Sequence, residues 1–232
     1  MENKGEREMN KVIAMIPARM GSQRLKKKNL RELNGIPLIT RAIRRCKDAG
    51  CFDEIWVNSE NIEFKLIADN EGVNFHQRPE HLGDDKATSE QFVHEFLKVH
   101  ECSYLLQVHS IAPLLTVDEV KKFTQDYTNS DYDVMLSCVH DQIEVAYKDR
   151  PINFTLSDKT NSQDLTPTQR ITWSITGWKR DVFLNAIENK ECATYAGNVG
   201  FFPVNPMAGH VIKTQLDLDI AEVFLNIVNQ GG

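Results

Sequence analysis

The chain has 232 residues, of which 41% are apolar and 26% are charged, and its formal net charge at pH 7 is −6. This length and apolar content suffice for one substantial core, whereas the negative charge argues against a general nucleic-acid binder. No apolar run approaches the length of a membrane span, and the five cysteines include no C-x-x-C pair, so reduced thiols in a cytoplasmic protein are the simplest interpretation.

The first eleven residues, MENKGEREMNK, lack the apolar segment of a secretory signal, and we expect them to form a disordered leader before a domain of residues 12–232. The first expected strand is the apolar run 12–16. Pro17 ends it because proline has no N–H to donate to a sheet.

The loop after this strand has the composition of an anion site. Gly21 gives the backbone freedom to approach a ligand and Ser22 adds a hydroxyl donor, while Arg19, Arg24 and the lysines at 26–28 add positive charge. A lysine run is more often a solvated surface, so the pattern alone is weak. The loop is neither a Walker loop nor a dinucleotide fingerprint. We interpret it as a triphosphate site.

Helical and strand patterns alternate along the rest of the chain, which predicts a mostly parallel sheet covered by helices in three layers. Ser89 is the expected N-cap of one helix. The polar segment 140–172 leaves the sheet as a lid, an oligomerisation arm or a disordered loop. The expected helices are 39–49, 62–70, 89–100, 117–127, 181–189 and 216–228, and the expected strands are 54–58, 73–77, 104–108, 134–139 and 200–204.

The motif I-P-A-R-x-G-S-x-x-x-x-x-K-N-L resembles the opening of the CMP-sialic acid synthetases (acylneuraminate cytidylyltransferases) and, more distantly, of the CMP-Kdo synthetases. LNGIPLITRAI and the later R-P-x-x-L-x-x-D pattern extend the resemblance over residues 12 to 115, and it is looser beyond. It implies a Rossmann-like nucleotidyltransferase fold, CTP and a small acidic sugar as substrates, Mg²⁺ as cofactor, and a homodimer formed through 140–172.

The resemblance also implies roles for individual residues. Arg19 and Lys28 match phosphate-binding positions, and Arg24 is expected to replace the charge of a family lysine where this chain has Gln23. Arg78, Ala87 and Ser89 match the loop that reads cytosine. The nucleotide-binding residues implied in the first loop are Ala18, Arg19, Met20, Gly21, Ser22, Arg24, Lys28 and Asn29.

Two further segments match with departures. LLQVHSIAPLL has one residue more than the family's L-Q-P-T-S-P-L, so either Gln107 or His109 takes the place of the family glutamine, and a core role for His109 is equally open. SQDLTPTQR resembles the segment that holds the acceptor, which points to Gln163 and, as the nearest cation, Arg170. Arg170 could instead contact the arm of a second subunit.

The largest departure lies near the C-terminus, where family members read D-I-D-T-x-x-D-L and the first two aspartates bind Mg²⁺. Here Val211 and Lys213 replace them. Asp217 remains as a weak metal candidate, although compensation of a helix dipole explains it better. The Lys213 ammonium could replace the metal charge, could mark lost activity, or could point to solvent from an edge strand.

These observations predict transfer of CMP from CTP to a 2-keto-3-deoxy sugar acid of the sialic type, with release of pyrophosphate and with Arg19, Lys28 and Lys213 as catalytic residues. One alternative is a cytidylyltransferase for another acceptor, such as a Kdo-like acid or a phosphonate. The other is a silent nucleotide-binding homologue that has lost its metal site.

Overall fold

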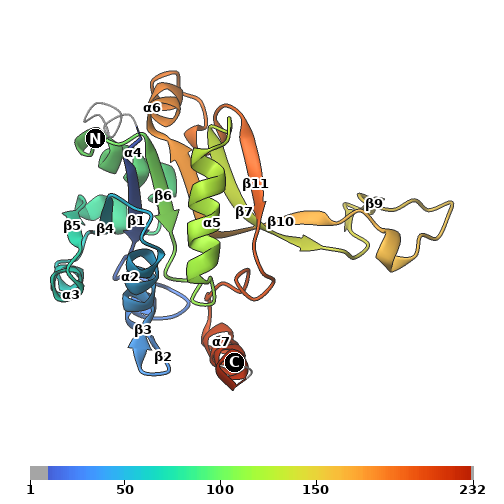
Figure 1. The fold of residues 1–232 in the computed structure, drawn as a ribbon, viewed down its shortest axis with the longest axis horizontal. Helices are drawn as coiled ribbons and strands as arrows, with labels where there is room; N and C mark the ends of the chain where they lie inside the picture. The colour runs from blue at the N-terminus through green and yellow to red at the C-terminus, as the bar shows by residue number, and fades with distance from the viewer. Residues whose placement is uncertain (1–9, 231–232) are drawn as a thin grey trace, which may run out of the picture.

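The structure, a computed structural model, describes residues 10–230, with side chains described to residue 227. Its centre is a seven-stranded sheet in the order β11-β7-β10-β6-β1-β4-β5 (Figure 1). The strands of this sheet are β1 (Val12–Pro17), β4 (Glu54–Ser59), β5 (Asn74–Gln77), β6 (Tyr104–Val108), β7 (Val134–Asp141), β10 (Thr168–Lys179) and β11 (Val199–Pro203).

The sheet is parallel except at β10, which pairs antiparallel with both β6 and β7. Because β1 lies between β4 and β6, the chain runs outward from β1 to β4 and then crosses to β6 on the other side. This is the topological switch point at which open α/β sheets bind ligands, outside the carboxyl ends of the strands.

Helices cover both faces of the sheet and bury two separate apolar cores. One face packs against α2 (Leu38–Ala49), α3 (Glu63–Glu71) and α5 (Val117–Thr128). The other face packs against α4 (Ser89–Val99) and α6 (Arg180–Glu188). Alternate residues of β1 enter the two cores: Ala14 and Ile16 one, Ile13 and Met15 the other. The expected three-layer α/β fold is therefore confirmed.

A third apolar cluster joins the first loop to the C-terminal part of the chain. Leu25 from the loop packs with Ile212 and with Leu218 of α7 (Gln215–Gln230). The short hairpin of β2 (Glu32–Leu33) and β3 (Ile36–Pro37) contributes Leu33 to the same cluster. The cluster therefore fixes the loop against the segment that precedes α7.

The expected elements are present with small shifts at their ends. β10, the hairpin strands β2 and β3, and two short strands in the arm were not among the expected strands. The N-cap of α4 is Thr88 and not Ser89, because the Thr88 side chain accepts the N–H of Gln91 and the Gln91 side chain accepts the N–H of Thr88. The leader expected at 1–11 lies outside the described residues for positions 1–9.

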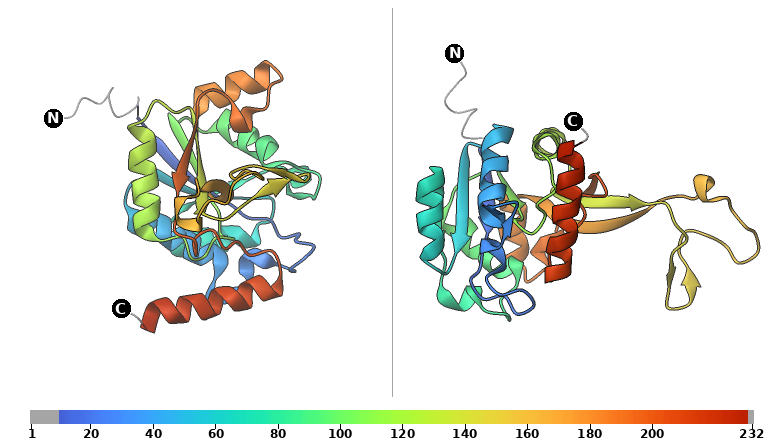
Figure 2. Two further views of the ribbon diagram at one scale, coloured as in Figure 1. Left: turned by 90° about the vertical axis from the view of Figure 1, so that its right-hand side faces the viewer. Right: turned by 90° about the horizontal axis from the view of Figure 1, so that it is seen from below.

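Segment 140–172 forms an arm that extends away from the sheet and its helices (Figures 1 and 2). The ends of β7 and β10 form its base, where Thr168 pairs with Asp141. Beyond them lie β8 (Ala146–Tyr147), β9 (Arg150–Pro151) and one 3-10 turn, η3 (Ser162–Asp164). Within residues 10–230, no helix is long and apolar enough to cross a membrane.

Candidate active site

A cavity of about 400 Å³ lies beside the loop that follows β1. It contains four of the residues expected at a nucleotide, together with Lys213, which was expected to be catalytic. Lys26 and Lys27 do not line it. Ile111 was not expected, although it lies within the segment of uncertain register. The residues that line the cavity are Arg19, Ser22, Gln23, Arg24, Lys28, Asp85, Ile111 and Lys213.

Hydrogen bonds to buried groups hold the loop in place. The N–H of Ala18 donates to the carbonyl of Asn58 at 2.9 Å. Asn29 is buried; its Nδ2 donates to the carbonyl of Arg19 at 3.0 Å, and its Oδ1 accepts from Ser110 Oγ at 2.7 Å. Asn29 therefore positions Arg19 from inside the protein.

The backbone of the loop differs from the expectation at Gly21. The left-handed conformation occurs at Lys27, with φ 50°, and not at Gly21. A Cβ atom at Gly21 would have no neighbour within 4 Å. The observed geometry of the loop therefore does not require glycine at this position.

The cations of the cavity repel one another and are poorly compensated. Burial, followed by the charges of Arg19, Arg24 and Lys213, lowers the pKa of Lys28. Among the described residues, Lys28 has no ion-pair partner. Arg19 Nη1 lies 2.8 Å from Asp85 Oδ1 and 3.1 Å from the carbonyl of Asp84. An anion bound here would relieve this repulsion.

Arg78, expected at the nucleotide, is instead bonded inside the protein. It is buried and pairs with Glu60 at 2.9 Å, and it also donates to the carbonyl of Ala18 and to Asn58. The other oxygen of Glu60 accepts the N–H of Met20 at 2.8 Å. Burial lowers the Arg78 pKa, although the Glu60 charge raises it. Arg78 and Glu60 thus anchor the start of the loop.

The segment expected to read cytosine lies next to the cavity through Asp85, but Ala87 and Ser89 do not line it. The N–H of Ala87 donates to Asp84 Oδ1 at 2.8 Å, and this bond, together with one from the N–H of Lys86, lowers the Asp84 pKa. The N–H of Ala87 is therefore already satisfied. Its carbonyl and the Ser89 hydroxyl remain for a base.

Gln107 and His109 lie at the carboxyl end of β6. Gln107 Nε2 and His109 Nε2 are both buried without a hydrogen-bond partner among the described residues. Burial, with a smaller contribution from the charge of Lys28, lowers the pKa of His109 to about 4. The imidazole is therefore neutral at pH 7. Unpartnered buried polar atoms are uncommon in proteins.

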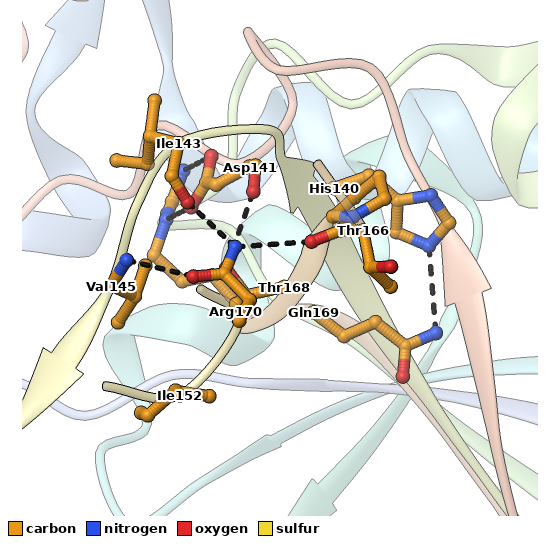
Figure 3. A pocket seen from close by; sticks show the side chains of 11 residues that line it. His140, Asp141, Ile143, Val145, Ile152, Thr166, Thr168, Gln169 and Arg170 are labelled. Atoms are coloured by element: carbon orange, nitrogen blue, oxygen red, sulfur yellow. Dashed lines mark hydrogen bonds and ion pairs between the residues drawn. The ribbon is translucent and has the colours of Figure 1, made fainter. Parts of the chain in front are cut away.

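Gln163 and Arg170 lie on the arm, and neither lines the 400 Å³ cavity. Arg170 is among the residues of a larger, open cavity of about 1410 Å³ at the base of the arm (Figure 3). There its Nε lies 2.7 Å from Asp141 Oδ2. Gln163 accepts a hydrogen bond from Gln142 through its carbonyl. Within one chain, the arm does not bring these side chains to the cations.

The segment before α7 places Lys213 in the cavity, and Lys213 is not on an edge strand. The Asp217 carboxylate accepts the N–H of Lys213 at 2.9 Å, the N–H of Thr214 at 2.7 Å and the Thr214 hydroxyl at 2.9 Å. The Asp217 N–H donates back to Thr214 Oγ1 at 3.3 Å. This reciprocal pattern caps α7 and places an anion in its first turn.

This set of side chains does not fit a Mg²⁺ ion held by the protein, because Mg²⁺ requires oxygen ligands. The carboxylate that lines the cavity, Asp85, is paired with Arg19. Asp217 caps α7 through Oδ2, and the side chains of Val211 and Lys213 offer no oxygen. Among residues 10–230, no three His, Cys, Asp or Glu side chains are grouped so that they could hold a metal ion.

Comparison with known proteins identifies the family of the chain. The model of the family described as "Cytidylyltransferase" matches residues 13–189, which include the loop, both segments beside it and the arm. The chain belongs to the cytidylyltransferase family. The fold and the enzyme class inferred from the sequence motifs are thereby confirmed.

Two relatives show the range of this cytidylyltransferase family. N-acylneuraminate cytidylyltransferase of Streptococcus agalactiae serotype III (strain NEM316) is 30% identical over 94% of this chain and 52% of its own length. Post-translational flagellin modification protein B of Campylobacter coli is 24% identical, over 95% of this chain and 97% of its own. The chain thus spans about half the length of the first of these relatives.

Two solved structures share the fold of this cytidylyltransferase. CMP:2-keto-3-deoxy-manno-octonic acid synthetase, complexed with CTP, superposes with a TM-score of 0.71 over 94% of this chain and 99% of its own, at 17% identity. 4-Diphosphocytidyl-2C-methyl-D-erythritol synthase of Anaerococcus prevotii DSM 20548 gives 0.69 over 97% and 100%, at 14% identity.

Proposed function

We propose that this cytidylyltransferase transfers CMP from CTP to the anomeric hydroxyl of a 2-keto-3-deoxy sugar acid of the sialic type. The cluster of cations in the 400 Å³ cavity carries the proposal, because a triphosphate is the ligand whose charge it matches. The acylneuraminate relative and the structural likeness to a CMP-Kdo synthetase support a sugar acid as acceptor.

In the proposed reaction the acceptor oxygen attacks the α-phosphorus of CTP. The bond from this phosphorus to its bridging oxygen breaks, its electron pair leaves with pyrophosphate, and the hydroxyl proton is lost to solvent. Arg19, Arg24 and Lys28 hold the phosphates in line and stabilise their developing charge. Where Mg²⁺ accompanies CTP, it adds positive charge on the phosphate oxygens.

The cytosine ring is proposed to contact the segment after Arg78. Cytosine offers an amino donor beside two acceptors, so it needs a carbonyl and at least one donor. The carbonyl of Ala87 and the Ser89 hydroxyl provide this combination. Gln107 Nε2 and His109 Nε2, unpartnered at the end of β6, are buried and do not line the cavity.

CTP should stabilise the protein more than ATP, GTP or UTP does. At a concentration of about 100 times its Kd, a ligand of the native state adds about 2.7 kcal/mol, which corresponds to a rise in the melting temperature of roughly 5–10 °C for a chain of this size. Differential scanning fluorimetry with all four nucleotides in the presence of Mg²⁺ measures this rise. Equal shifts from all four would reject a cytidine site.

The acceptor is identified by pyrophosphate release from CTP with a panel of acids: an acylneuraminic acid, Kdo and a 2-hydroxyphosphonate. We expect release with the nine-carbon acid. Release only with Kdo or the phosphonate would support the alternative of a cytidylyltransferase for another acceptor, since the residues expected at the acceptor match the family least. Binding of CTP without release from any acceptor would instead support a silent nucleotide-binding homologue.

The arm is proposed to pair with a second subunit, since it has almost no core of its own. Within 142–167, all of which the structure describes, only Leu165 is buried. By contrast, Ile143, Tyr147 and Leu156 are 62%, 63% and 84% exposed. Three largely exposed apolar side chains on one segment support an interaction surface on the arm. In the dimer, Gln163 and Arg170 would face the acceptor at the partner's cations.

The wild-type protein should therefore sediment as a dimer at micromolar concentration, and Leu156→Asp should shift it towards the monomer. Leu66→Asp is the matched control, because Leu66 is an equally apolar side chain, 66% exposed, on α3 away from the arm. Sedimentation velocity measures both variants. A wild-type monomer, or an equal response to the two substitutions, would show that the arm does not pair.

A further inference from the structure

The distribution of charge around the cavity carries an inference that rests on the proposed transfer of CMP and extends it. Arg19, Arg24, Lys28 and Lys213 all line the cavity, whereas the carboxylate among the lining residues, Asp85, is paired with Arg19 at 2.8 Å. Lys213 contributes to lowering the Lys28 pKa, so its charge is felt at the position of Lys28. The cavity is therefore cationic before any ion enters it.

Lys213 is held at this place from two sides. Ile212 is fully buried, and its N–H donates to the carbonyl of Ile111 at 2.8 Å, next to another lining residue. Asp217 accepts the N–H of Lys213 itself at 2.9 Å. Ile212 also shares an apolar cluster with Leu25 of the first loop, which follows β1. The backbone of Lys213 is thus fixed relative to the loop that carries Arg24 and Lys28.

The two family aspartates that bind a metal are absent here, and the nearby carboxylates already accept hydrogen bonds from other protein groups. Asp217 uses its carboxylate to cap α7, and Val211 is apolar. A Mg²⁺ ion in the cavity would meet four cations and would compete with Arg19 for Asp85. An ammonium needs acceptor oxygens only, and the phosphates of CTP provide them.

We propose that the Lys213 ammonium takes the place of a metal ion held by the protein and neutralises the charge that develops on the departing pyrophosphate. As the bond between the α-phosphorus and the bridging oxygen breaks, its electron pair stays on that oxygen. Lys213 donates a hydrogen bond there and remains protonated throughout. Because the interaction strengthens as charge builds, it acts more on the transition state than on bound CTP.

Lys213→Met tests the proposal, since methionine keeps the chain length and removes the charge. Lys26→Met is the matched control, because Lys26 belongs to the same basic loop but does not line the cavity. Two measurements are made with each protein: binding of inorganic pyrophosphate in EDTA by isothermal titration calorimetry, and initial rates of pyrophosphate release from CTP across a Mg²⁺ titration.

We expect Lys213→Met to weaken pyrophosphate binding in EDTA about tenfold or more and to lower kcat about 100-fold, with a smaller change in the KM for CTP. Lys26→Met should match the wild type, and wild-type turnover should persist in EDTA. The proposal would be overturned if Lys213→Met and Lys26→Met had the same affinity for pyrophosphate and the same kcat. Wild-type pyrophosphate binding that requires Mg²⁺ would also overturn it.

A wild-type protein without turnover on any acceptor would refute the proposed function. The pyrophosphate titration would still decide the role of Lys213, because it needs no acceptor. Conversely, full turnover in Lys213→Met would overturn the role of Lys213 while the transfer of CMP stood.

Discussion

Replacing Arg78 with methionine should destabilise the native state by about 3–5 kcal/mol, the usual cost of removing one partner of a buried ion pair. The side chains of Arg78 and Glu60 are 2% and 11% exposed, and they lie 2.9 Å apart. Without the guanidinium, the Glu60 charge stays buried and uncompensated. The carbonyl of Ala18 and the amide of Asn58 also lose a donor.

Urea denaturation of wild type and Arg78→Met, at an unchanged m value, measures this loss. Arg44→Met is the control: Arg44 makes an equally short ion pair with Glu71, but its side chain is 52% exposed, so its removal should change stability little. The double variant Glu60→Met with Arg78→Met should recover part of the loss. Equal midpoints for Arg78→Met and Arg44→Met would contradict a buried anchor.

The regular part of the fold could be predicted because its signals are local. β1 and β6 are apolar runs buried on both faces, and α2 and α3 end at Gly50 and Gly72, which adopt left-handed conformations there. Each signal lies within a few residues of the element that it specifies. Tertiary contacts therefore changed only the ends of these elements.

β10 was missed although Ile171, Trp173 and Ile175 alternate with polar residues, which is the pattern of a strand, because its first residues lie in the polar segment 140–172. Its pairing with β7 shifts register between Ile171 and Thr176, and Trp173 within this stretch has φ 57°. The Thr172 hydroxyl bonds that of Ser137, 35 residues away. A buried hydroxyl network of this kind exists only once both strands are in place.

The site was predictable to the extent that one loop supplies it. Arg19, Arg24 and Lys28 are close in sequence and line one cavity. Arg78 is buried against Glu60, which belongs to another loop, and nothing local in the sequence indicates that the two meet. Lys213 enters the cavity only through the packing of Ile212 with the first loop. The sequence showed that Lys213 replaces a family aspartate, but it did not show where the Lys213 side chain lies.

Replacing Lys28 with methionine should lower kcat/KM for CTP by about 100- to 1000-fold, the usual effect of removing one preorganised group that stabilises transition-state charge. Lys28 has no ion-pair partner among residues 10–230, and burial together with Arg19, Arg24 and Lys213 lowers its pKa. This repulsion is relieved when phosphate enters, so the ammonium contributes to binding as well as to the rate.

Initial rates of pyrophosphate release, with CTP varied at a saturating acceptor concentration, measure the change for Lys28→Met. Lys27→Met is the control, because Lys27 is the neighbouring lysine, has its side chain 61% exposed and lies 4.0 Å from Glu63 outside the cavity. A phosphate-binding role requires that the variant raise KM and lower kcat, whereas Lys27→Met leaves both unchanged. If the two variants behave alike, the basic run is a solvated surface and the cavity is not the triphosphate site.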